Sequence, residues 1–159
     1  MSGMRFFAAV LLALGCLFAP VGQTQLLKRN APPQPKLEPV AETKLLMAGI
    51  AEPNLRAIGQ LLKTKPKDAE GWAFARGQAL LVAETGNLLM MRPPQGRDQQ
   101  DTWMTYSAEL RASSTALARS LAAKDYVQSR TALATTANAC NRCHQTFKVA
   151  TRVNPFPDE

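Results

Sequence analysis

The residues most able to do chemistry lie near the C-terminus, in the pentapeptide Cys140-Asn141-Arg142-Cys143-His144. Two thiols three residues apart on a helix can bond to the two vinyl groups on one edge of a haem. The imidazole that follows directly can turn beneath the ring and bind its iron. The pattern therefore predicts one covalently attached haem c, held by Cys140 and Cys143, with His144 as the proximal iron ligand.

Two other uses of a cysteine pair fit this sequence poorly. A structural zinc site takes four ligands, but the chain has no second cysteine pair, and His144 is its only histidine. A thiol redox pair follows a strand and opens a helix, whereas this pair lies late in an expected helix. With one histidine, the chain cannot supply a second imidazole to the iron or a distal histidine base for peroxidase chemistry. We therefore predict that the protein is not an enzyme.

The elements that must position this motif are helices. Of the 159 residues, 46% are hydrophobic and only 6% aromatic, which favours an all-α fold. We expect Pro53 to kink or interrupt the first helix, Asp98 or Asp101 to cap the third, and Asp125 to cap the fourth. Long helices joined by short connections predict an antiparallel up-down-up-down four-helix bundle. The helical stretches delimited by prolines, glycines and caps are about 40–63, 67–91, 98–124 and 126–150.

The fourth helix carries the clearest periodicity. Seven mostly apolar residues of this helix recur at alternating spacings of four and three, which is typical of the inward seam of a bundle helix. Cys140 and His144 lie on this seam, with Cys143 beside them, so the haem is expected near the C-terminal end of the helix. The seam consists of Tyr126, Arg130, Leu133, Ala137, Cys140, His144 and Phe147.

Bundle geometry predicts the haem pocket. The end of the fourth helix lies level with the start of the first, the end of the second and the start of the third. Met47 and His144 match in height, so Met47 is the candidate distal iron ligand, ahead of Met90, Met91 and Met104. Alternatively, Met47 only fills a gap in the core, as methionine often does. The other expected pocket residues are Leu46, Ile50, Trp103 and Phe147.

The motif continues as Gln145-Thr146-Phe147-Lys148. With this continuation and its helical context, the chain resembles the class II c-type cytochromes, the cytochrome c′ group, over about residues 40–150. The resemblance implies a periplasmic helix bundle with the haem between helices, a proximal histidine at His144 and a distal residue from the first helix. Family members with a methionine ligand would place it at Met47. The family often has a basic residue one turn earlier, where this chain has Thr43.

The N-terminal part resembles an export segment. Arg5 precedes an apolar run over 6–18, which has signal-peptide character and is too short to span a membrane. Two alternatives remain: an uncleaved membrane tether, and a lipid attached to Cys16. We expect an export signal at 1–22, a proline-rich leader or tether at 23–39, the haem domain at 40–150 and a C-terminal tail at 151–159. The protein is expected to be periplasmic or otherwise exported.

The charge indicates the class of partner. The net charge of +7 is spread along the chain, without the basic run and interleaved aromatics of a nucleic-acid site. The sequence therefore predicts electron transfer by a single-haem cytochrome to a redox partner protein, which an acidic surface would suit. The alternative is binding of small gases such as NO or CO at an open distal site. A homodimer is compatible with the sequence.

Overall fold

The computed structural model describes residues 35–156, and every regular element among them is a helix, as expected for an all-α protein. These helices belong to one compact unit, Leu37–Glu159. The expected export signal, including Cys16, and most of the leader lie outside the described residues. Within 35–156, no helix has the length and apolarity needed to cross a membrane.

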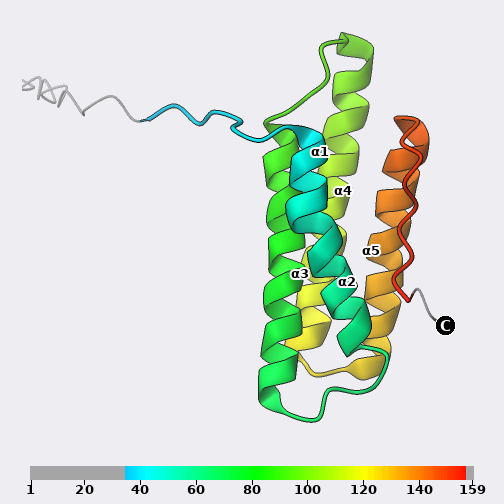
Figure 1. Cartoon of the computed structure of the whole chain (residues 1–159). Coiled ribbons are helices and arrows are strands. Elements are labelled where there is room, and N and C mark those ends of the chain that lie inside the picture. The colour runs from blue at the N-terminus through cyan, green and yellow to red at the C-terminus, as the bar shows by residue number, and fades with distance from the viewer. Residues whose placement is uncertain (1–34, 157–159) are drawn as a thin grey trace, which may run out of the picture. The chain divides into compact units, whose positions relative to one another are not determined.

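The first helical stretch is continuous but not uniform. It consists of α1 (Thr43–Leu46), a π-helical turn, η1 (Met47–Ala51), and α2 (Glu52–Leu61) (Figure 1). Pro53 lies at the start of α2, where its ring would crowd the carbonyl four residues earlier in a tight α-helical turn. The wider π turn gives that ring room. The interruption expected at Pro53 therefore takes the form of a widened turn rather than a break.

Three longer helices follow, and side chains cap two of them. Asp68 accepts a hydrogen bond from an amide of the first turn of α3, and Asp125, the cap predicted for the fourth helix, does the same for α5. The capping prediction for α4 was wrong. Gly96 is the N-cap there, without a side-chain bond, and Asp98 lies inside the first turn, where its charge favours the helix dipole. The helices are α3 (Ala69–Met90), α4 (Arg97–Ala122) and α5 (Tyr126–Thr146).

Helix α5 ends at Thr146, earlier than the expected end near residue 150. Lys148 adopts the left-handed conformation, with φ of 56°. The Val149 amide donates to the His144 carbonyl at 2.8 Å and the Lys148 amide to the Gln145 carbonyl at 3.3 Å, a Schellman turn. Such turns usually contain glycine, so a lysine gave no sequence signal. The chain then reverses, and the segment after it runs back along α5 (Figure 1).

The long helices pack side by side, α3 on α4 and α4 on α5, with α2 against α3 (Figure 1). Leu133 and Ala137 of the predicted α5 seam are buried, whereas its other members are only partly buried. The predicted seam underestimates the buried face of α5, because the helix also buries a second row of small residues. That row consists of Ser129, Ala132, Thr136 and Ala139.

Helices α3 and α4 approach closely at Gly86. A Cβ atom added there would lie 2.7 Å from the Ser107 carbonyl oxygen and 2.9 Å from the Arg111 amide nitrogen. Both are backbone atoms of α4, so they cannot rotate away as a side chain could. Only a residue without a side chain fits this crossing.

Candidate functional site

Hydrogen bonds join helix ends at the level of the candidate site. Arg92, just after α3, donates through Nε to the Ala41 carbonyl at 2.9 Å, close to the start of α1. Trp103 of α4 donates through Nε1 to the Leu89 carbonyl of α3 at 2.7 Å. These bonds place the start of α1, the end of α3 and the start of α4 at one end of the helical unit, which is where the expected pocket residues lie.

Aromatic side chains join the end of α5 to the start of α4. The rings of Trp103 and Phe147 meet edge to face, with centroids 5.1 Å apart. Phe147 also contacts Tyr106 edge to face at 6.4 Å, and the Tyr106 hydroxyl lies 3.0 Å from Thr146 Oγ1. The structure thus brings together two of the predicted pocket residues, Trp103 and Phe147, and adds Tyr106, which the predicted set did not include.

The remaining predicted pocket residues gather on the apolar core. Leu46 is buried, and Met47 and Ile50 are partly buried and pack against the same hydrophobic cluster. Cys140 packs against this cluster too. Met47 lies at the start of the π turn, so the widened turn begins at the candidate distal ligand. π turns within helices occur frequently at functional sites.

The last two turns of α5 carry the cysteine pair, and both thiols are free. Burial, followed by the neighbouring Cys143, raises the pKa of the Cys140 thiol to about 12. The pKa of Cys143 is raised as well, first by burial and then by the negative charge of Glu109. Thiol redox pairs need a lowered pKa. The electrostatics here are the opposite of those in a thiol redox site.

These pKa shifts predict slow alkylation of the haem-free chain. For Cys140, a rise from 9.0 to about 12 lowers the thiolate fraction at pH 8 by roughly a thousandfold relative to an ordinary cysteine. Reaction with iodoacetamide, followed by mass spectrometry of peptides, should label Cys143 before Cys140. Both rates should rise to that of a free thiol in urea. Labelling of folded Cys140 at the unfolded rate would contradict the prediction.

The same shift gives a pH dependence. A thiol whose pKa is higher in the folded than in the unfolded chain stabilises the fold at pH values below its unfolded pKa. This contribution is lost as the pH rises through the folded pKa. For Cys140 the window lies between 9.0 and about 12. The free energy of unfolding of the haem-free chain should therefore fall across this alkaline window.

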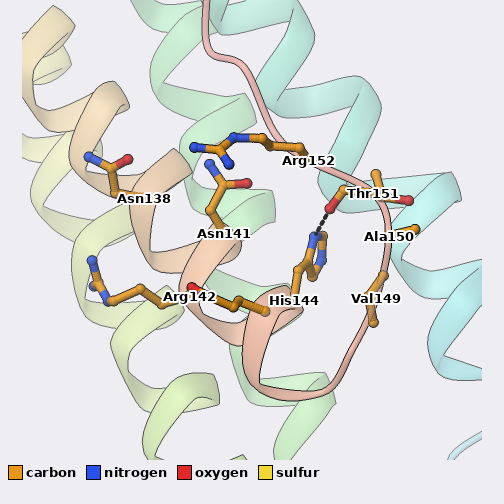
Figure 2. Close-up of a pocket in the computed structure, with 9 residues that line it drawn as sticks. Asn138, Asn141, Arg142, His144, Val149, Ala150, Thr151 and Arg152 are labelled. Atoms are coloured by element: carbon orange, nitrogen blue, oxygen red, sulfur yellow. Dashed lines mark hydrogen bonds between the residues drawn. The ribbon is translucent and has the colours of Figure 1, made fainter.

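The His144 imidazole points from α5 towards the segment that follows it. Its Nδ1 lies 2.7 Å from the Thr151 carbonyl oxygen (Figure 2). A carbonyl only accepts, so the neutral ring carries its proton on Nδ1, and Nε2 keeps the lone pair that binds a metal. Metal-bound histidines commonly donate their other ring N–H to a backbone carbonyl or carboxylate. The contact at Nδ1 therefore leaves Nε2 of His144 available to bind a metal.

The tail that supplies this carbonyl is fixed to α5. The Asn141 side chain donates to the Val153 carbonyl at 2.9 Å and accepts from the Val153 amide at 2.8 Å. Between α5 and the tail lies an open hollow of about 510 Å³ lined by Asn138, Asn141, Arg142, His144, Gln145 and residues 149–152 (Figure 2). Sequence patterns did not identify Thr151 or Val153, because their backbone groups, not their side chains, make these contacts.

The donor set suits a haem better than a metal ion alone. Among residues 35–156, no three His, Cys, Asp or Glu side chains gather as a metal site. Two neutral thiols and one imidazole, beside an apolar cluster, fit covalent attachment of a macrocycle that brings its own four nitrogen ligands.

No protein-family model, no curated protein and no solved structure matches the chain. A function for the site therefore depends on the residues and geometry of the site itself.

Proposed function

We propose that this chain is an exported, single-haem c-type cytochrome of the class II, cytochrome c′-like kind, and that it transfers electrons. Cys140 and Cys143 attach the haem, and His144 binds its iron. The helices would form the antiparallel up-down-up-down bundle that this class implies. One observation carries the proposal: a complete C-x-x-C-H motif lies in the last two turns of α5, and its histidine is engaged at Nδ1, which leaves Nε2 for iron.

Each residue of the site has a role in this proposal. Burial favours the protonated form of both thiols in the haem-free chain, and these two side chains would hold the haem through thioether bonds. Leu46, Ile50 and the edge-to-face pair of Trp103 and Phe147 supply apolar surface that excludes water from the site. When bound, a haem supplies one iron that cycles between the ferric and ferrous states.

Electron transfer is favoured over catalysis by what surrounds the motif. The chain has one histidine, and Nδ1 of that imidazole bonds the tail, so it does not serve as a distal acid or base. The net charge of +7 would attract a redox partner with an acidic surface, because opposite fields speed encounter between proteins.

Met47 distinguishes electron transfer from gas binding. A thioether on the iron gives a six-coordinate, low-spin centre and raises the reduction potential, and a small ligand must first displace it. We expect the ferric protein to show the weak far-red absorption band of an iron–methionine bond. Met47→Ala should remove this band, lower the potential and speed the binding of carbon monoxide.

Met104→Ala is the matched control, because Met104 lies on α4 and is 41% exposed. Its spectrum and carbon monoxide kinetics should equal those of the unaltered chain. A high-spin ferric spectrum that Met47→Ala leaves unchanged would contradict the electron-transfer proposal. It would support the alternative, in which NO or CO binds at an open distal site crowded by Leu46 and Ile50.

A further inference from the structure

We infer that the C-terminal tail, residues 148–156, is a positioning element for the iron ligand: it holds the Thr151 carbonyl on His144 and so fixes the ring and lowers the reduction potential. This inference rests on the proposed function, because it concerns the proximal ligand of that same haem. Thr151 contributes a backbone oxygen and does not touch iron.

The tail is anchored on both sides of Thr151. On the α5 side, the left-handed residue Lys148 reverses the chain directly after the helix. Beyond Thr151, Asn141 holds both polar backbone groups of Val153, at 2.9 and 2.8 Å. Only two residues separate Thr151 from the first anchor and one from the second. The carbonyl therefore has little freedom to leave Nδ1.

A second pair of contacts lies further along the tail. The Arg130 guanidinium lies 3.9 Å from the centre of the Phe156 ring, within the range of a cation–π interaction. Pro155 packs on α2 at Gly59, where an added Cβ would lie 2.2 Å from the Pro155 carbonyl oxygen. The tail thus follows α5 and also meets α2, and it cannot shift at Thr151 without disturbing these contacts.

The bond between His144 and Thr151 has a chemical consequence for iron. A ring whose Nδ1–H donates to an oxygen is a more basic ligand through Nε2, and it favours the more highly charged, ferric ion. The same bond also fixes the ring plane relative to α5. Val153 and Phe156 cover part of the core, but covering the core does not require a 2.7 Å contact at Nδ1.

Two substitutions loosen the tail without altering Cys140, Cys143 or His144. Asn141→Ala removes both hydrogen bonds to Val153, and Gly59→Ala places a methyl group against the Pro155 carbonyl. Each has a matched control. Asn138 lies one turn earlier on α5, is exposed and lines the same hollow. Gly77 is a helical glycine with nothing within 4 Å of an added Cβ.

The experiment uses the full-length chain with its haem. We expect Asn141→Ala and Gly59→Ala to raise the reduction potential relative to the unaltered chain, while Asn138→Ala and Gly77→Ala leave it unchanged. In the ferrous carbon monoxide form, the Nδ1 proton of His144 should exchange slowly with solvent in the unaltered chain and both controls. It should exchange faster in the two tail variants.

Unchanged potentials and unchanged proton exchange in both tail variants would overturn the inference, as would equal shifts in the controls. Failure of the proposed function can be distinguished from failure of this inference about the tail. If the unaltered chain carries no haem, the protonated nitrogen of the neutral His144 ring can still be identified by ¹⁵N NMR. If the proton lies on Nδ1 in the unaltered chain and moves to Nε2 only in the tail variants, the result would support positioning of the ring by the tail. A proton on Nε2 in the unaltered chain would refute it.

Discussion

Replacing both cysteines with serine should abolish covalent retention of haem. Thioether bonds survive acid–acetone extraction, so the unaltered chain should keep its haem with the polypeptide, whereas the Cys140→Ser, Cys143→Ser double variant should release all of it. Each single variant should retain haem through one bond, or fail to mature. The measurement is the haem absorbance of the precipitated protein compared with that of the extract.

Gln145→Ser is a suitable control, since this exposed residue lies in the same turn of α5 but outside the C-x-x-C-H pentapeptide whose thiols form the bonds. It should retain haem like the unaltered chain. Complete extraction of haem from the unaltered chain would contradict covalent attachment, and with it the function proposed above.

Gly86→Ala should strongly destabilise the folded chain, because it inserts a methyl group where α3 and α4 approach closely. The added Cβ would meet the backbone of α4 at 2.7 and 2.9 Å, so the two helices must separate. Overpacking of this kind costs about 1–3 kcal/mol, occasionally more, and we expect the upper part of that range. The midpoint of thermal unfolding, followed by circular dichroism, should fall by about 10 °C.

Gly77→Ala on the same helix separates this steric effect from helix propensity. Nothing lies within 4 Å of an added Cβ at Gly77, and alanine is favoured over glycine inside helices by about 1 kcal/mol. The unfolding midpoint of Gly77→Ala should therefore rise slightly. If Gly86→Ala were as stable as Gly77→Ala, the close approach of α3 and α4 at this position would be wrong.

The helical content and most helix positions could be predicted, because periodicity and capping are local properties of the sequence. Asp125 was identifiable as a cap since its side chain makes the capping bond. The Gly96 cap of α4 and the end of α5 before Lys148 were not, because neither residue makes a capping hydrogen bond with its side chain.

The same contrast between local sequence and backbone geometry applies to the candidate site. The C-x-x-C-H motif is contiguous, so its donor atoms could be named from the sequence. The contact of Thr151 with His144 could not be foreseen. A backbone carbonyl is present in every residue, and only the reversal of the chain at Lys148 selects this one.

The π turn at Met47–Ala51 has a consequence for comparing this helix with others. A π turn is equivalent to one residue inserted into an α-helix, and one residue corresponds to about 100° of rotation. Residues before the turn, such as Leu46, are therefore rotated around the helix axis relative to the positions that the periodicity of Leu55 and Ile58 would predict. An alignment of this chain with an unbroken α-helix needs a one-residue gap within 47–51. Without that gap, one half of the helix is matched to the wrong face.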